Sequence, residues 1–224
     1  MIATAARMLV VAKAPVPGRV KTRLAAGVGD EAAAGLAAAA LADTLAAATA
    51  AVGAVRCVLA LDGDLADPAV VDGPLLASLV EGWRVVPQVA GDLGVRLAAA
   101  HAACGPGPVV QVGMDTPQAT PDDLLAVARG LAEDDAVLGP AVDGGWWVLG
   151  VRDPRVAAAL VDVPMSTPTT GADTHTALLA AGWRVGTAAT LDDVDTADDA
   201  ARVAALAPGS RFARRWHEVA GVRR

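Results

Sequence analysis

The chain has 224 residues, which is ample for one domain and short for two. Hydrophobic residues make up 54% of it, so it can build a core, and its net charge of −7 argues against a general nucleic-acid or anionic-membrane surface. The two cysteines, Cys57 and Cys104, lack the spacing of a metal site or a disulfide scaffold. With no leader pattern and no apolar run of about 18 residues, we expect a cytoplasmic protein that does not span a membrane.

Strand-like and helix-like segments alternate over the first 140 residues. Apolar runs predict strands at 8–12, 55–61, 83–86 and 108–112, and alanine-rich or capped stretches predict helices at 30–52, 68–80, 94–103 and 121–132, with Asp30 and Thr120 as N-caps. Further on, 137–138 and 146–151 are predicted as the arms of a wide hairpin, followed by a helix at 173–181, a strand at 183–186 and a helix at 196–206. We therefore expect a single α/β domain over residues 1–224, with a mainly parallel sheet covered on both faces and a late antiparallel hairpin.

A loop with four cations follows the first predicted strand. Lys13, Arg19, Lys21 and Arg23 lie within eleven residues that contain no acid. A cationic loop between a strand and a helix can bind phosphate, because side-chain charges and helix N–H groups point at the same anion. The alternative is a solvated basic loop, and the glycine patterns of the P-loop and of dinucleotide-binding folds are both absent. If the loop is exposed, replacing Lys21 and Arg23 should leave the fold intact.

Polar residues also follow two other predicted strands, at the edge where open α/β sheets bind ligands. Asp115 comes after the strand 108–112 in a Gly-Met-Asp-Thr-Pro turn. A carboxylate there can bind a hard cation such as Mg²⁺, although Asp-Thr-Pro is also an ordinary Asx-turn. After the strand 83–86, Gln88, Asp92 and Arg96 could bind a base or a ribose.

A second acidic segment, Leu191 to Asp199, precedes the last predicted helix. Asp198 and Asp199 have the position of first-turn acids, which suit the helix dipole. Asp193 and Asp195 come before the helix and alternate along an extended segment, so both carboxylates can face one side. They could bind a metal or simply belong to the capped start of the helix.

The turn of the predicted hairpin has the sequence Asp143-Gly144-Gly145-Trp146-Trp147. Two glycines let the backbone approach a ligand closely, and an adjacent tryptophan can wall a pocket or stack on a sugar. The alternative is an ordinary hairpin turn whose tryptophans belong to the core. Alternation along a strand would direct one tryptophan inward and the other outward. We predict that Trp146 lines an acceptor side and that Trp147 packs inward. The three histidines are scattered and have no nucleophile elbow, so no hydrolase triad is predicted.

Five motifs between residue 9 and about residue 200 resemble, in order, those of one family: A-K-A-P-V-P-G-R-V-K-T-R-L, Q-V-A-G-D-L-G-V-R-L, Q-V-G-M-D-T-P, L-G-P-A-V-D-G-G-W-W-V-L-G and D-D-V-D-T-A-D-D. The chain resembles the glycosyltransferase-like family described as "transferase 1, radical-SAM/selenodomain-associated", some members of which are described as arsenosugar-biosynthesis glycosyltransferases. It is more distantly similar to 2-phospholactate guanylyltransferase and the molybdopterin nucleotidyltransferases. The resemblance implies a GT-A fold, a nucleotide-diphospho-sugar transferase-like three-layer sandwich, with a nucleotide or nucleotide-sugar donor and Mg²⁺ or Mn²⁺.

The resemblance also implies roles for individual residues. Asp115 would be the principal metal ligand, where glycosyltransferases have D-x-D and this chain has M-D-T, and Asp195, with Asp193 in reserve, would complete the metal site. Asp143 would lie near the acceptor and act as its base. The donor phosphates and nucleotide would be held by Lys13, Arg19, Lys21, Arg23, Gln88, Asp92 and Arg96, Lys21 also serving catalysis, and the acceptor side would include Gly144, Gly145 and Trp146.

Two reactions fit these roles. The first is glycosylation of a small-molecule acceptor from a nucleotide-sugar donor. The second is nucleotidyl transfer from an NTP to a phosphorylated or phosphonate-like small acceptor with release of pyrophosphate, in which positioning and charge neutralisation carry catalysis. A non-catalytic nucleotide-binding module is the third reading. We expect no nucleic-acid or membrane partner, and a homodimer is left open.

Overall fold

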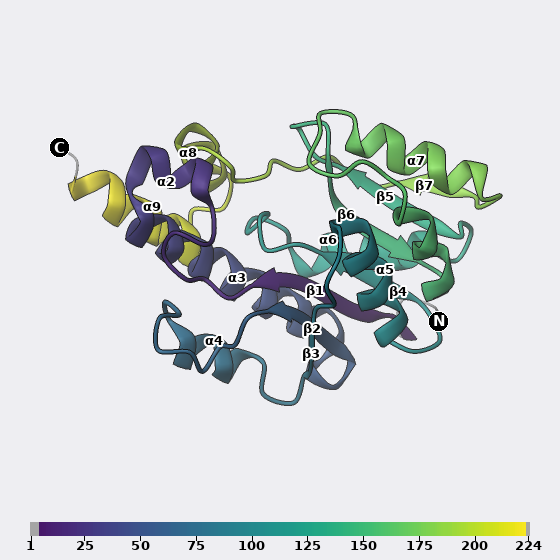
Figure 1. The fold of residues 1–224 in the computed structure, drawn as a ribbon, viewed down its shortest axis with the longest axis horizontal. Helices are drawn as coiled ribbons and strands as arrows, with labels where there is room; N and C mark the ends of the chain where they lie inside the picture. The colour runs from purple at the N-terminus through teal and green to yellow at the C-terminus, as the bar shows by residue number, and fades with distance from the viewer. Residues whose placement is uncertain (1–4, 223–224) are drawn as a thin grey trace.

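The computed structural model describes residues 5–222, and its centre is a seven-stranded sheet in the order β3-β2-β1-β4-β6-β5-β7 (Figure 1). The strands are β1 (Arg7–Lys13), β2 (Cys57–Asp62), β3 (Arg84–Pro87), β4 (Val109–Val112), β5 (Ala136–Pro140), β6 (Trp146–Val151) and β7 (Val185–Thr187). Strand β6 pairs antiparallel with both β4 and β5, and the other ladders are parallel. The predicted hairpin is therefore confirmed, and its second arm lies inside the sheet, between β4 and β5.

Helices cover both faces of the sheet, as predicted. Alternate residues of the central strands point to opposite sides, so both faces are apolar and each is buried under helices. From β1, Met8, Val10 and Ala12 enter the core under α3, α4 and α6, whereas Leu9 enters the core under α5, α7 and the 3₁₀ helix η2. The helices are α2 (Thr22–Val28), α3 (Asp30–Val52), α4 (Gly73–Leu79), α5 (Leu93–Ala103), α6 (Pro121–Gly130), α7 (Thr170–Ala180), α8 (Ala197–Leu206) and α9 (Arg211–Val222), with 3₁₀ helices η1 (Ala54–Arg56) and η2 (Pro154–Leu160).

Helix α3 joins the sheet to a second helical cluster. Its buried Leu41 belongs to the core beside β1, whereas Leu36 packs in a separate core with residues of α2, α8 and α9. Figure 1 shows α2, α8 and α9 gathered at one end of the molecule, away from α7 and β7. By length and composition α3 could cross a membrane, contrary to our expectation, but 67% of its most apolar stretch is buried in this fold. Its hydrophobicity is therefore accounted for by packing on two sides.

Some predicted boundaries are wrong for local reasons. The helix predicted at 68–80 is shortened to α4, because the Asp64 and Asp67 carboxylates accept hydrogen bonds from backbone N–H groups two residues ahead, which stabilises turns instead. The N-cap of α3 is Gly29 rather than Asp30. Thr120, in contrast, caps α6 in a reciprocal pair of hydrogen bonds with the third residue of the helix, as the sequence predicts.

Candidate functional site

The segment between β7 and α8 closes the carboxyl edge of the sheet. Backbone hydrogen bonds connect it first to the end of β5, at Leu138 and Pro140, and then to the turn after β4, where the Val194 N–H donates to the Asp115 carbonyl at 3.0 Å. The cationic loop after β1 reaches the same edge. Three regions that are far apart in the sequence thus meet where open α/β sheets bind ligands.

Lys21 is at the centre of this meeting point. Its ammonium lies 2.7 Å from Asp115 Oδ1 and 3.3 Å from Asp195 Oδ1, and it donates a hydrogen bond to the Val194 carbonyl. Burial lowers the pKa of Lys21, but the charges and hydrogen bonds of Asp115 and Asp195 outweigh burial and raise the pKa overall. The lysine therefore stays charged. Arg23 adds a contact of 3.2 Å to the other oxygen of Asp195. We name Lys21, Asp115, Val194 and Asp195 the Lys21 cluster.

The backbone at Lys21 is left-handed, with φ 49° and ψ 44°, a conformation that non-glycine residues seldom adopt. Its side chain is only 9% exposed, against 72% for Arg23. Lys21 is thus a buried link between distant segments, and the expectation of an exposed loop residue is wrong for it. No local pattern around Lys21 indicates this burial, because the partners of Lys21 lie up to 174 positions away.

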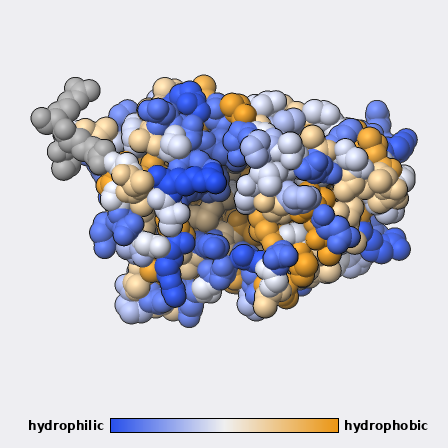
Figure 2. Space-filling view, turned by 45° about the horizontal axis from the view of Figure 1, so that its top comes forward, coloured by the Kyte–Doolittle hydropathy of each residue, from blue (hydrophilic) through white to orange (hydrophobic). Residues whose placement is uncertain are grey.

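The four loop cations separate into two pairs. Whereas Lys21 and Arg23 turn toward carboxylates, Lys13 and Arg19 line a hollow of about 380 Å³ at the carboxyl ends of β1 and β2. Figure 2 shows a hollowed region in the middle of one face, with hydrophilic residues around it. The other charged residues that line the hollow at the end of β2 are Asp62, Asp64 and Asp67.

Asp193 has a carboxylate oxygen, Oδ1, that is buried and has no hydrogen-bond partner. Burial raises the pKa of Asp193, the negative charges of Asp115, Asp143 and Asp195 also raise it, and Lys21 opposes them, so that the pKa is about 7. Four carboxylates from three regions therefore influence one another here. Val194, which is 1% exposed, points into the core between Asp193 and Asp195, so the predicted alternation places both acids on the side of the site.

The donor set fits Mg²⁺ or Mn²⁺, because carboxylate oxygens are hard ligands and one of them is buried without a partner. Within residues 5–222, no three His, Cys, Asp or Glu side chains are already arranged around a common metal position. Asp115 Oδ1 and Asp193 Oδ1 are both buried without a hydrogen-bond partner, but Asp115 Oδ1 lies 2.7 Å from the Lys21 ammonium, which leaves Asp193, the reserve ligand, as the less neutralised acid. The Asp-Asp-Val-Asp pattern was the signal that could have given it more weight.

Gln88 and Arg96 form a network behind the hollow. The Gln88 amide donates hydrogen bonds of 2.8 and 2.9 Å to backbone carbonyls of β1 and β2, and its oxygen accepts from Arg96. Arg96 also lies 3.0 Å from Asp62. Gln88 therefore holds strand ends together and orients Arg96, while Asp92 is exposed at the N-cap of α5 without a side-chain capping bond. Their predicted role in nucleotide binding stays a prediction.

The hairpin turn, residues 141–145, packs closely against its own protein. Asp143 Oδ1 accepts a hydrogen bond of 2.8 Å from the Gly145 N–H. A Cβ on Gly144 would lie 2.0 Å from the Pro168 carbonyl oxygen, and the Gly171 N–H donates to the Gly144 carbonyl at 2.9 Å. Gly144 is thus required by the neighbouring loop, whether or not a ligand also approaches it.

The two tryptophans of β6 lie on opposite faces of the sheet. Trp147 is 3% exposed and its indole N–H donates to the Ala189 carbonyl at 2.8 Å, so it packs inward as predicted. Trp146 is half-buried against the core under α7, and its indole N–H donates to Thr174 at 3.1 Å. Its proposed acceptor role therefore has to be compatible with a packing role.

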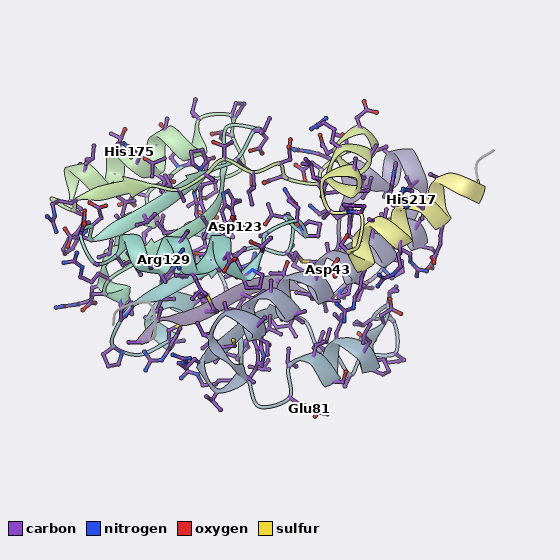
Figure 3. All side chains as sticks on the ribbon, turned by 180° about the vertical axis from the view of Figure 1, so that it is seen from behind. Asp43, Glu81, Asp123, Arg129, His175 and His217 are labelled. Atoms are coloured by element: carbon purple, nitrogen blue, oxygen red, sulfur yellow. The ribbon has the colours of Figure 1, made fainter. Side chains whose placement is uncertain are left out.

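The histidines do not converge. His101 is buried in the core, where its ring contacts Gln111, and Figure 3 places His175 and His217 at opposite ends of the molecule. A mechanism built on a pair of histidines has no basis in this arrangement, and the charged groups at the carboxyl edge remain the candidate site.

Comparison with known proteins gives a class and then a family. The fold is that of nucleotide-diphospho-sugar transferase-like proteins: a Desulfovibrio desulfuricans G20 protein provisionally described as such a transferase is 25% identical, with a TM-score of 0.81 over 95% of this chain and 93% of that chain. The chain is a transferase-like enzyme by this similarity. It belongs to the family DUF2064, described as an uncharacterized protein conserved in bacteria, whose model matches residues 44–167.

Two further structures share the fold at lower identity. A CMP:2-keto-3-deoxy-manno-octonic acid synthetase in complex with CTP is 14% identical, with a TM-score of 0.54 over 91% of this chain and 98% of that chain. A Mycobacterium tuberculosis H37Rv protein in complex with manganese is 21% identical, with a TM-score of 0.53 over 88% of this chain and 96% of that chain. Comparison with curated protein sequences finds no match.

Proposed function

We propose that the protein is a divalent-metal-dependent transferase that uses a nucleotide-sugar donor to glycosylate a small acceptor. The observation that carries this proposal is the meeting of loop cations with Asp115, Asp193 and Asp195 at the carboxyl edge of the sheet. Cations alone would suffice to hold phosphate, and acids alone would repel it. Their combination suits a diphosphate that is bound together with a metal.

Asp115 would hold the metal, with Asp195 and Asp193 from the closing segment. When bound, a divalent cation neutralises charge that builds on the leaving diphosphate. Lys13 and Arg19, at the hollow, would bind the donor phosphates and so position the reacting bond. The proposed relation to the radical-SAM-associated glycosyltransferase-like family supports the same donor class.

Asp143 would take the proton from the acceptor hydroxyl. Its hydrogen bond to the Gly145 N–H fixes the orientation of the carboxylate, which a general base requires. The electrostatic effect of Asp143 on Asp193 indicates that the hairpin turn lies near the proposed metal site. An acceptor bound beside Trp146 would then be within reach of the donor.

Nucleotidyl transfer is the second candidate, and the similarity to a synthetase bound to CTP favours it. A thermal-shift screen of NTPs and NDP-sugars with Mg²⁺ or Mn²⁺ tests both, because a ligand that binds only the native state raises the melting temperature. Release of a nucleoside diphosphate from an NDP-sugar supports glycosyl transfer, whereas release of pyrophosphate from an NTP supports the alternative. If no nucleotide binds in the presence of metal, both proposals are wrong.

A further inference from the structure

We infer that Lys21 is an internal substitute for the divalent cation: its ammonium occupies carboxylate oxygens that the metal would bind, so the metal enters when the nucleotide draws Lys21 away. This inference rests on the proposed metal-dependent function. It adds a definite prediction about the protein without substrate, namely that its own lysine keeps the metal affinity low.

The contacts of Lys21 are those of a cation in an oxygen cage. An ammonium group has three N–H donors. The three oxygens around this one are Asp115 Oδ1 at 2.7 Å, Asp195 Oδ1 at 3.3 Å and the Val194 carbonyl. Carboxylate and carbonyl oxygens are also the ligands that Mg²⁺ and Mn²⁺ prefer. A metal ion cannot take the same carboxylate oxygens while the ammonium stays, because the two positive charges would repel each other at short range.

The other loop cations show that this arrangement is particular to Lys21. Lys13 is 53% exposed and its ammonium lies 3.9 Å from Asp62. Arg23 is 72% exposed and contacts the outer oxygen of Asp195. Lys21, at 9% exposed, is the cation placed between carboxylates of two different segments. Lys21 was predicted to bind phosphate, but its side chain points away from the solvent from which a nucleotide would arrive.

The exchange requires movement of one long side chain. A bound diphosphate offers Lys21 a new anion, and rotation of its flexible side chain would release Asp115 Oδ1 and Asp195 Oδ1. The unpaired oxygen of Asp193 is already available beside them. Nucleotide and metal would then each raise the affinity of the protein for the other, since coupling between two binding events is reciprocal.

The test measures binding of Mn²⁺ alone, by the electron paramagnetic resonance signal of free Mn²⁺, in the absence of nucleotide. Lys21→Gln should bind Mn²⁺ roughly tenfold or more tightly than the parent, which is within the usual range of such couplings. Arg23→Gln is the matched control, because it removes a neighbouring positive charge while Lys21 still occupies its three oxygens. The Mn²⁺ affinity of this variant should stay near that of the parent. Equal Mn²⁺ affinity of Lys21→Gln and the parent would overturn the inference.

Melting temperatures provide a second readout. Mn²⁺ alone should raise the melting temperature of Lys21→Gln and leave that of the parent nearly unchanged. Adding Asp115→Asn to the variant should remove the gain. If Lys21→Gln does not fold, Lys21→Met takes its place, because its apolar side chain retains the packing of the lysine stem. If Mn²⁺ binds neither Lys21→Gln nor Lys21→Met, the inference is also overturned.

The outcome is separable from that of the proposed function. If the parent shows Mn²⁺-dependent nucleotide stabilisation but the Lys21 variants gain no affinity for Mn²⁺ alone, the inference is wrong and the proposed function stands. If the variants gain Mn²⁺ affinity and no nucleotide binds with metal, the occupation of the metal oxygens by Lys21 is supported and the proposed function is wrong.

Discussion

The Lys21 cluster and the hairpin turn carry the two most distinctive motifs of the sequence, and they use them differently. In the Lys21 cluster, charged groups from distant segments neutralise one another, and Asp193 beside it keeps a buried oxygen without a partner. In the hairpin turn, Gly144 is required by the backbone of the loop at Pro168 and Gly171.

This difference shows that a distinctive motif can reflect either a functional site or a packing requirement. Charges that are brought together at the cost of burial and of a left-handed lysine indicate a candidate functional site, whereas small residues that touch the backbone are explained by packing. Substitutions in the Lys21 cluster should therefore act mainly on binding and activity. Substitutions of Gly144 and Gly171, which touch backbone of the neighbouring segment, should act mainly on stability.

The largest effect is expected at Trp147. Trp147→Ala should lower the free energy of unfolding by about 3–5 kcal/mol, because it leaves a cavity under β6 and removes the indole hydrogen bond. Trp146→Ala should cost clearly less, since Trp146 is half-buried. Urea denaturation of both variants measures the difference. Equal losses would show that the two faces of β6 are equally dependent on their tryptophans.

The next effect concerns Asp115. Asp115→Asn keeps the size of the side chain and removes its charge, so the variant should fold normally, lose metal-dependent nucleotide binding and lose activity by about 100-fold or more. Asp122→Asn, an exposed change in the first turn of α6, is the matched control and should behave as the parent does. Parent-like metal–nucleotide binding by Asp115→Asn would make the aspartate structural.

The raised pKa of Asp193 predicts that the stability of the protein depends on pH. Between the pKa of an unfolded aspartate, near 4, and the folded value of about 7, the native state holds a proton that the unfolded state has lost. The free energy of unfolding therefore decreases as the pH rises through this window. Asp193→Asn removes the group, so without metal it should be more stable than the parent by about 1–3 kcal/mol at pH 8, with a smaller difference at pH 5. Urea denaturation in EDTA measures this, and equal stability at pH 8 would contradict it.

The smallest effect is expected at Arg23. Its side chain is mostly exposed and its ion pair with Asp195 is of the surface type, so Arg23→Ala should change the free energy of unfolding by about 0.5 kcal/mol or less. Nucleotide affinity should fall more visibly than stability. A melting temperature several degrees below that of the parent would show that Arg23, like Lys21, holds the closing segment in place.

Local signals in the sequence were sufficient for much of the fold. Alanine content predicted α3, and Thr120 with its capping partner predicted the start of α6. The helix predicted at 68–80 was wrong because Asp64 and Asp67 form turns with their own backbone, a competition that composition does not reveal. The helices α2 and α9 and the 3₁₀ helices η1 and η2 were not predicted.

For the site, the sequence supplied the residues but not their pairing. Asp115 and the acidic segment were found because each follows or precedes a recognisable element. That Lys21 turns toward Asp195, and that Asp193 keeps an unpaired oxygen, depend on contacts across some 174 positions of the chain. Such contacts are set by the tertiary fold, and no local pattern encodes them.

The closing segment also determines when the site can exist. Lys21 leaves the ribosome well before Val194 and Asp195, and at 5–20 residues per second the interval is about 10–35 s. During this time the first loop carries its cations without the carboxylates that later neutralise them. A chain that stops before Val194 would have the cationic loop and Asp115 but would lack the Val194 carbonyl and the Asp195 carboxylate. Completion of the site is thus a late event in synthesis, and only a chain that extends past Asp195 can form it.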